Sequence, residues 1–302
     1  MKERIRGSIF QAEPRVDREG GGAVVKIQIC VCSHKPVLAA DISFLTPIQA
    51  GAALSEHRFQ GFLPDDTGEN ISVKNLSYCE LTAQYWAWRN LRADYIGLFH
   101  YRRYLYPDGA DVHPYRMERA PDEATLRRLD FMRLPDIIAS CDLIVPRGER
   151  QPISVRRQYA AAPSHQKSDL LLVERILRER YPEYAQAVND YFSGCVHFFC
   201  NLFIMNRTVF EDYCAWLFAV LEEFDRCANP DGCTRPRVDG YLGERLLGVF
   251  YTRWAGKLRT KELPWVQFEP NPAKLAGKKL ELLALPVESR RRATVKRLLG
   301  ML

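Results

Sequence analysis

A cluster of imidazole, phenol and guanidinium groups follows an apolar run in the first half of the chain. Residues 95–99, YIGLF, have the composition of a buried β-strand and lead directly into His100, Tyr101, Arg102 and Arg103. Guanidinium groups hold phosphate oxygens in a bidentate geometry, so this cluster favours an anionic ligand. The alternative is a solvated loop in which His100 only caps the strand, because runs of charge usually face water.

Other polar residues could also take part in chemistry. Asp65 and Asp66, in the sequence DDTG, could hold a metal ion or ribose hydroxyls, although Asp and Gly together mark turns more often. Glu244 follows Asp239 in an otherwise apolar helical segment, where a carboxylate could act as a general base. Harmless glutamates are also common on helix surfaces. His197, beside two phenylalanines, is more typical of a core or strand-edge histidine.

Strands and helices that alternate along the chain must position these residues. Residues 24–34 form a near-continuous apolar run, typical of a strand buried on both faces of a parallel sheet. A helix is expected over 77–91, opened by a capping box of Ser77 and Glu80. Further elements are predicted as strands at 141–147 and 196–207 and helices at 168–181, 208–224 and 240–254. This order indicates an α/β fold whose parallel strands end at one edge, where ligands bind.

Composition limits the class of protein. The chain has 302 residues, 47% of them hydrophobic and 26% charged, which suffices for one large domain or two modest ones. Residues 1–22 lack the apolar core of a signal peptide, and no segment approaches the roughly 20 apolar residues of a membrane span. We therefore expect a cytoplasmic protein. The nine cysteines lack the paired spacing of a zinc site, and we interpret them as reduced thiols.

Several enzyme classes lack their motifs in this sequence. There is no P-loop, no G-x-G-x-x-G after the first strand, no G-x-S-x-G and no H-E-x-x-H. This disfavours nucleotide hydrolases, dinucleotide dehydrogenases and zinc proteases. A nucleic-acid-binding protein would spread basic and aromatic residues over one face, whereas the positive charge here gathers near the C-terminus. We therefore expect no nucleic-acid partner.

The C-terminal segment has its own pattern. Residues 286–302 carry five Lys or Arg and one Glu. The apolar residues that recur there at helical spacing are Val295, Leu298, Leu299 and Leu302. Such a basic amphipathic segment could lie on the anionic inner face of the cytoplasmic membrane. A solvated or docked terminal helix fits the pattern equally well.

A long block resembles a known family. Residues 65–105, DDTGENISVKNLSYCELTAQYWAWRNLRADYIGLFHYRRYL, are similar to the signature of the DUF4422 family. SHK at 33–35, HFFCNLFIMNRTVFEDYCAWLF at 197–218 and GYLGERLL at 240–247 resemble further blocks of that family. The similarity covers roughly residues 24–254. Members are usually encoded among capsule, exopolysaccharide and lipopolysaccharide genes and are regarded as glycosyltransferases.

The resemblance implies a glycosyltransferase, more narrowly a hexosyltransferase, that moves a sugar from a nucleotide-sugar donor to a growing, lipid-linked cell-surface polysaccharide. It also implies a GT-A-like, Rossmann-related α/β fold with a mostly parallel sheet flanked by helices. We divide the chain into an N-terminal tail (1–22), one transferase domain (23–270) and a basic C-terminal tail (271–302). Within the domain, residues 23–147 would form the donor half and residues 148–270 the acceptor half.

The sequence departs from the usual GT-A pattern at one place. GT-A enzymes generally carry an Asp-x-Asp motif after a strand of this kind, and it holds a divalent cation against the diphosphate. This chain has His100, Tyr101, Arg102 and Arg103 at the equivalent place. We therefore expect no metal site and no cofactor, with Arg102 and Arg103, together with His100, neutralising the leaving diphosphate.

The remaining site residues follow from the same resemblance. Glu244 is the first choice for the base of an inverting transfer and Asp239 the second, whereas a retaining reaction could dispense with a base. Residues expected to bind the nucleotide or sugar are His34, Lys35, Asp65, Asp66, Thr67, Asn70, Lys74 and Tyr85. Residues expected on the acceptor side are His165, His197 and Asn201. The alternative is a non-catalytic assembly protein that binds glycans or nucleotide sugars on a degenerate transferase fold.

Overall fold

The structure is a computed structural model that describes residues 25–37, 40–107, 114–228 and 235–285, with Val287, Ser289, Arg291, Arg292, Thr294 and Val295. Its strands are β1 (Ile27–Ser33), β2 (Leu45–Gln49), β3 (Leu63–Pro64), β4 (Tyr95–His100), β5 (Arg103–Leu105), β6 (Tyr115–Glu118), β7 (Leu143–Pro146), β8 (Glu149–Arg150), β9 (Val196–His197), β10 (Phe203–Asn206), β11 (Thr260–Leu263) and β12 (Trp265–Phe268). Its α-helices are α1 (Asn75–Tyr78), α2 (Leu81–Asn90), α3 (Glu123–Arg128), α4 (Leu134–Ala139), α5 (Val155–Ala161), α6 (Lys167–Arg180), α7 (Ala185–Ser193), α8 (Arg207–Ala228), α9 (Val238–Trp254) and α10 (Pro272–Ala284). Short 3-10 turns are η1 (Ala52–Leu54), η2 (Ser72–Lys74), η3 (Phe131–Arg133) and η4 (Pro182–Tyr184).

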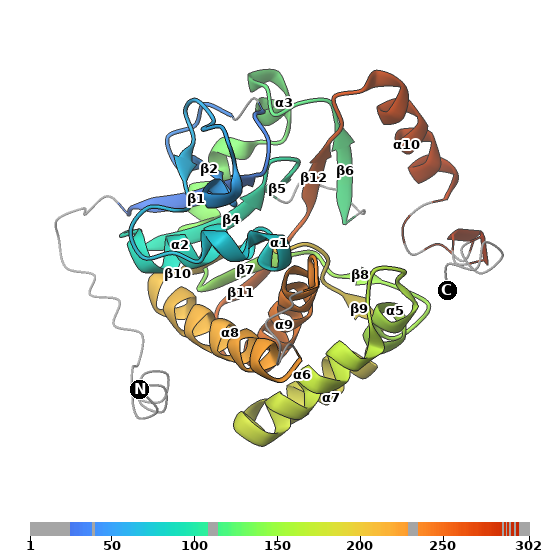
Figure 1. Cartoon of the computed structure of the whole chain (residues 1–302). Coiled ribbons are helices and arrows are strands. Elements are labelled where there is room, and N and C mark those ends of the chain that lie inside the picture. Colours follow the sequence, from blue (N-terminus) through green and yellow to red (C-terminus); the bar gives the residue numbers. More distant parts are fainter. Residues whose placement is uncertain are drawn as a thin grey trace.

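Ten strands of the described chain form one sheet, with helices on both of its faces (Figure 1). The main order is β11-β7-β10-β4-β1-β2-β3, and β5, β12 and β6 extend the sheet from the end of β4. β1 is parallel to β2 and β4, whereas β10 is antiparallel to both of its neighbours, β4 and β7. This mixed but mostly parallel sheet, flanked by helices, confirms the predicted fold class.

The central strands are buried on both faces because their successive side chains enter two different cores. On β1, Cys30 and Cys32 belong to one core, and Ile29 and Val31 belong to the other. Helices α2, α8 and α9 cover the first core, and α3, α4, β5 and β12 close the second. The apolar run at 24–34 therefore contains the predicted buried strand, although β1 covers only Ile27–Ser33.

The segment 196–207, predicted as one strand, is two strands in different sheets. β9 pairs with β8 in a separate two-stranded sheet, whereas β10 enters the main sheet. Between them Cys200 has a φ of 71°, a left-handed conformation that a continuous strand cannot contain. Since Phe203 pairs antiparallel with Leu98, the residues before β10 lie at the same end of β4 as His100.

The helix predicted over 77–91 is interrupted, and its predicted capping box is wrong. Cys79 breaks the helix into α1 and α2 with φ 51° and ψ −128°. The hydroxyl of Ser77 donates a hydrogen bond to the carboxylate of Asp239, and Glu80 accepts one from Asn201 at 2.8 Å. Both side chains therefore bind a distant part of the fold rather than the backbone of their own helix.

The two halves predicted within the domain share one sheet, because β10 lies between β4 and β7 and β12 pairs with β5. The C-terminal segment 271–302, predicted as a tail, begins with the helix α10, which lies at the periphery of the molecule (Figure 1). Most of 286–302 lies outside the described residues, as does the N-terminal tail.

Asp65 anchors the polar loop that follows β3. Its side chain is fully buried, and its two carboxylate oxygens accept hydrogen bonds from the backbone N–H groups of Gly51 and Ala52, both at 2.9 Å. The hydroxyls of Ser72 and Thr82 donate to the same carboxylate. Four donors satisfy this charge without solvent, so Asp65 has a structural role here and is not open to a nucleotide.

Asp65→Asn should therefore destabilise the protein by about 2 kcal/mol or more, because an amide cannot accept from all four donors and leaves buried groups unpaired. Asp66→Asn is the matched control, since Asp66 pairs with Arg58, which is 57% exposed, and should change stability by less than about 1 kcal/mol. Urea unfolding followed by circular dichroism measures both. Equal stability losses for the two variants would refute the anchoring role.

Candidate active site

The parallel pairing of β1 with β4 brings two basic segments, residues 34–35 and 100–103, to one edge of the sheet. This region is called the basic edge below. Cys32 pairs with His100, so His34 and Lys35 leave β1 beside the point where Tyr101 leaves β4. The backbone N–H of Tyr101 donates to the carbonyl of Cys32 at 2.9 Å, which extends this contact by one residue. This is the carboxyl-end edge at which the sequence predicted a ligand.

The ring of Tyr101, only 6% exposed, lies at the centre of this basic edge. The ring centroid of His100 lies 4.3 Å from it and that of His34 5.4 Å. The Lys35 ammonium and the Arg102 guanidinium lie 5.2 and 5.1 Å from the same ring centroid. Cation–π attraction of this kind offsets part of the repulsion between the two positive groups.

A turn from β4 into β5 holds the two arginines. His100 pairs antiparallel with Arg103, and the carbonyl of Arg102 accepts a hydrogen bond from the N–H of Phe268 at 2.8 Å. The Arg103 guanidinium lies 5.7 Å from the ring centroid of Trp265. Residues 100–103 therefore form a corner of the sheet and not the solvated loop considered above. The Nε–H groups of Arg102 and Arg103 are buried and lack a hydrogen-bond partner among the described residues.

The two histidines of the basic edge are neutral at pH 7. Burial lowers the pKa of His100 to about 3, with further lowering by Arg103 and Arg102. Burial also lowers the pKa of His34, as does the charge of Lys35. Nδ1 of His100 accepts the N–H of Arg102 at 3.3 Å, which leaves Nε2 to carry the proton. His100 can therefore donate a hydrogen bond to a ligand, and the positive charge expected from it is absent.

Glu244 approaches the basic edge from α9. Its side chain is 22% exposed, and its carboxylate lies 3.5 Å from Arg245. Burial raises the pKa of Glu244; Arg245 opposes this rise, and the neighbouring negative charge of Glu80 adds to it. The charge of Arg103 also reaches this carboxylate. A partly exposed carboxylate with a raised pKa holds a proton more readily than an ordinary glutamate and can act as a general base.

Asp239, the second candidate base, lies in the interior of the protein. It is fully buried in the first turn of α9, beneath the hydroxyl of Ser77. Burial and the neighbouring charge of Asp225 raise the pKa of Asp239 to about 7. Because Asp239 has no exposed surface, a substrate hydroxyl cannot reach it in this conformation. The geometry therefore favours Glu244.

Strained backbone conformations gather around the same place. Cys79, Cys200 and Arg237 all have φ between 51° and 71°, and Asp130 is the other described non-glycine residue with positive φ. Such conformations cost on the order of 1–3 kcal/mol each and cluster at functional sites. A Cβ atom at Gly240 would lie 3.3 Å from the Cys79 sulfur, so α9 packs tightly against the break between α1 and α2.

Arg237 is a candidate that the sequence analysis missed. Its Nε donates to the hydroxyl of Tyr241 at 2.9 Å, and its guanidinium lies 5.3 Å from that ring centroid. Its positive charge contributes to the lowered pKa values of both His34 and His100. The only signal in the sequence is a basic pair before α9, which does not say what the arginine approaches.

Asn201, predicted on the acceptor side, supports the site from within. Its side-chain amide donates to Glu80 at 2.8 Å and to the carbonyl of Gly240 at 3.3 Å. The residue is 4% exposed. Asn201 therefore ties the segment before β10 to both α2 and α9.

The two acceptor-side histidines differ in their surroundings. The ring of His165 lies between those of Tyr159 and Tyr241, with centroids 4.2 and 4.3 Å away, which connects it to Arg237. Burial, together with the charge of Arg245, lowers the pKa of His165 to about 4. His197 is instead fully buried in β9, with Nε2 3.0 Å from the carbonyl of Ile153. His197 is thus a core histidine, the reading that its flanking phenylalanines favoured.

The other predicted nucleotide-binding residues have partners outside the basic edge. Asp66 pairs with Arg58 at 2.6 Å, and Thr67 accepts a hydrogen bond from Trp86 at 2.9 Å. Asn70 donates to the carbonyl groups of Asp66 and Gly68. These contacts stabilise the polar loop, which follows β3 and therefore begins at the same carboxyl-end edge of the sheet as the residues after β1.

Lys74 and Tyr85 are also engaged elsewhere. Lys74 lies 3.5 Å from Asp225, and the hydroxyl of Tyr85 donates to Glu69 at 3.2 Å.

Within the described part of the chain, no group of three or more His, Cys, Asp or Glu side chains is placed to hold a metal ion.

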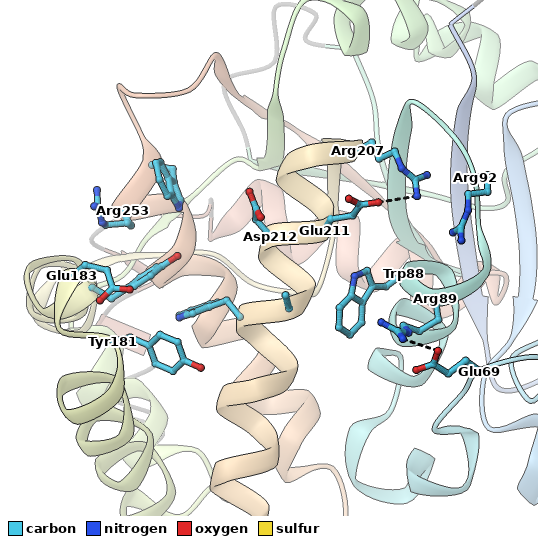
Figure 2. Close-up of a pocket in the computed structure, with 14 residues that line it drawn as sticks. Glu69, Trp88, Arg89, Arg92, Tyr181, Glu183, Arg207, Glu211, Asp212 and Arg253 are labelled. Carbon is cyan, nitrogen blue, oxygen red and sulfur yellow. Dashed lines mark hydrogen bonds and ion pairs between the residues drawn. The ribbon is translucent and has the colours of Figure 1, made fainter. Parts of the chain in front are cut away.

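A separate pocket of about 540 Å³ lies at the opposite end of β4. Arg92, just before β4, and Arg207, just after β10, line it, and the antiparallel pairing of Asn206 with Tyr95 places both at the amino end of β4. Figure 2 shows its labelled side chains on both sides of α8. None of the residues that the sequence analysis selected lines this pocket, so it is distinct from the basic edge.

Comparisons with known proteins give the chain a family. Residues 28–255 match the model of the family described as a domain of unknown function, DUF4422. No curated protein matches the chain. A solved structure described as an apo structure of the bifunctional glycosyltransferase WbbM is similar over 81% of this chain, with a TM-score of 0.71 and 26% identity. The match spans 45% of that longer chain. The protein thus has a glycosyltransferase fold, and it belongs to the DUF4422 family, as its sequence blocks predicted.

Proposed function

We propose that the protein is a hexosyltransferase that moves a sugar from a nucleotide-sugar donor to a growing, lipid-linked cell-surface polysaccharide. The observation that carries this proposal is the pair Arg102 and Arg103, whose buried Nε–H groups lack partners among the described residues at the carboxyl end of β4. The glycosyltransferase fold supports it. The capsule, exopolysaccharide or lipopolysaccharide context follows from the family resemblance.

The proposed role of the basic edge is to stabilise the leaving group. As transfer proceeds, the bond between the anomeric carbon and the phosphate oxygen breaks, and its electron pair stays on that oxygen. Fixed guanidinium donors from Arg102 and Arg103 bind this growing charge more strongly than they bind the intact donor. Arg237 adds a third positive charge, and neutral His100 adds an N–H donor. In this scheme cationic side chains perform the task that a divalent ion performs elsewhere, and no cofactor is required.

The proposed role of Glu244 concerns the acceptor. Its hydroxyl oxygen forms the new bond to the anomeric carbon, and its proton passes to the Glu244 carboxylate. The raised pKa of Glu244 increases its affinity for that proton. With Glu244 as the base, a single displacement inverts the configuration at the anomeric carbon.

Arg102→Ala and Arg103→Ala should each lower kcat/KM by about 10²–10³-fold, because the leaving group loses a fixed donor. The nucleotide sugar for this assay is chosen from a panel of UDP, GDP, dTDP and CMP sugars. It is the one that most raises the melting temperature of the unmodified protein. Release of free nucleotide measures turnover. The unmodified protein should keep its full rate in EDTA.

Two further variants test whether the loss of kcat/KM is specific to the guanidinium groups of Arg102 and Arg103. Arg127→Ala removes a 79% exposed arginine of α3 and should leave the rate unchanged. Arg102→Lys keeps the charge but loses the bidentate fork, so its rate should lie between those of the parent and Arg102→Ala. Activity that disappears in EDTA and returns with Mg²⁺ or Mn²⁺ would contradict the proposed charge neutralisation. Glycan binding without any nucleotide-sugar binding would favour the non-catalytic assembly protein.

Glu244→Gln should lower kcat by about 10²-fold or more, because the amide cannot take the acceptor proton. The rate of the unmodified protein should fall as the pH drops through the pKa of Glu244, since only the carboxylate accepts a proton. Because burial raises that pKa, the acidic limb should lie above the range of an ordinary glutamate. The pH dependence of kcat measures this limb.

Asp239→Asn is the paired variant, because Asp239 is fully buried and should influence stability more than turnover. Loss of turnover in Asp239→Asn with an active Glu244→Gln would reverse the two assignments.

We also propose that the C-terminal part binds an anionic membrane surface. Residues 272–302 contain eight Lys or Arg and two Glu, a net charge of +6 that equals the net charge of the whole chain. α10 has no buried residue, and its Leu280 and Leu283 are 67% and 80% exposed. Exposed leucines on a helix within a basic segment suit anionic lipid, where each Lys or Arg contributes about 1 kcal/mol. Among the described residues, every helix falls short of the length or the apolar composition of a membrane span.

Replacing both Leu280 and Leu283 with Glu should abolish flotation with phosphatidylcholine vesicles that contain phosphatidylglycerol, since the variant removes apolar surface and adds negative charge. Deletion of 286–302 should weaken flotation by removing the larger share of the basic residues. Met132→Glu, which alters an equally exposed residue elsewhere, should float like the parent. Binding that persists in the Leu280 and Leu283 variant, or that is equal on pure phosphatidylcholine, would exclude this surface.

A further inference from the structure

The pocket around α8 has the size of a ligand site. Its volume is about 540 Å³, within the roughly 300–1,000 Å³ common for small-molecule pockets. Figure 2 shows Trp88 and Arg89 of α2 on one side of α8, with Tyr181 and Arg253 on the other. Ala215 of α8 also lines the pocket, so a small side chain leaves room between the two sides.

Aromatic rings line both sides of this pocket, and neighbouring rings hold them in place. Trp88 stacks on Phe218 with centroids 5.7 Å apart and an interplanar angle of 9°. Tyr184 stacks on Trp216 with centroids 4.7 Å apart and an angle of 15°. Rings that are already fixed offer flat apolar surface, and little side-chain entropy is lost when a ligand covers them.

The charged groups of the pocket balance. Four arginines and four carboxylates line it, and two of the ion pairs are Arg89 with Glu69 at 2.7 Å and Arg207 with Glu211 at 2.8 Å. A lining without net charge gives little attraction to a phosphate or a nucleotide. Guanidinium donors beside carboxylate acceptors instead suit hydroxyl groups, which both donate and accept hydrogen bonds.

Two lining residues also have unused donors. The indole N–H of Trp216 and the Nε–H of Arg253 are buried without a hydrogen-bond partner among the described residues. An unpaired buried donor costs about 1–3 kcal/mol. Because both N–H groups are buried, a ligand oxygen would recover this cost only after a movement of the side chains.

We infer that this pocket binds a neutral oligosaccharide of several sugar units, the growing product of the proposed function, on which this inference rests. Sugar rings present apolar C–H faces to aromatic rings, and their hydroxyl groups match the mixed donors and acceptors of the lining. β4 has six residues and so spans roughly 20 Å between the basic edge and the pocket. A glycan of several units can cover that distance along the surface, so the pocket would retain a product whose growing end is at the basic edge.

Titration with neutral tetra- to octasaccharides of glucose, galactose and mannose tests this inference by tryptophan fluorescence. Trp88, Trp216 and Trp254 line the pocket, so binding should change the emission in a saturable way. Ala215→Phe fills the pocket without removing a contact and should weaken binding at least tenfold. Arg92→Ala removes an exposed donor and should weaken it several-fold. Glu222→Phe, on an exposed part of α8 outside the pocket, should bind like the parent.

Tighter binding of an oligogalacturonate than of every neutral glycan, no saturable signal with any neutral glycan, or full binding by a folded Ala215→Phe variant would each overturn the inference. Stabilisation by nucleotide sugars reports separately on the proposed function. Ala215→Phe should keep that stabilisation and single-sugar transfer to a short acceptor. A protein that binds neutral glycans at this pocket but no nucleotide sugar would contradict the transferase proposal and leave the glycan site standing.

Discussion

The parallel pairing of β1 with β4 gathers basic side chains at one edge of the sheet. Lys35, Arg102, Arg103 and Arg237 lie there, and the charges of Glu80 and Glu244 also reach it. Like charges at such distances repel, and burial weakens the screening by water. The lowered pKa of His100 reflects both effects. Basic side chains gathered in this way attract an anion, which supports the proposed phosphate-bearing ligand.

The rest of the fold keeps these groups together against their repulsion. The Tyr101 ring attracts two of the cations, and the backbone of Arg102 is bound to β12. The strained positions Cys79 and Cys200 allow α2 and the segment before β10 to turn beside the edge. Preorganised donors are worth more than flexible ones, because they need no rearrangement as charge develops on the ligand.

The two ends of β4 differ in chemistry as well as in position. The carboxyl end carries a cluster of basic side chains, whereas the pocket at the amino end has equal numbers of basic and acidic side chains and several aromatic rings. The two proposed ligands, a charged leaving group and a neutral polymer, would make opposite demands on a binding surface. The length of one strand separates the two surfaces to which they are assigned.

The sequence by itself determined the buried strand of β4, the basic residues that follow it and the family, because these depend on local composition and on contiguous blocks of residues. It also placed Glu244 on a helix, although not near Arg103. Only the tertiary structure decided which polar groups remain available. Asp65 meets its four donors from positions 7 to 17 residues away, and Ser77 meets Asp239 across 162 residues of sequence. The antiparallel entry of β10, the turn of Arg102 and Arg103 onto β12 and the approach of Arg237 have the same origin. Local pattern cannot reveal them, because burial and charge compensation are properties of what packs against a residue.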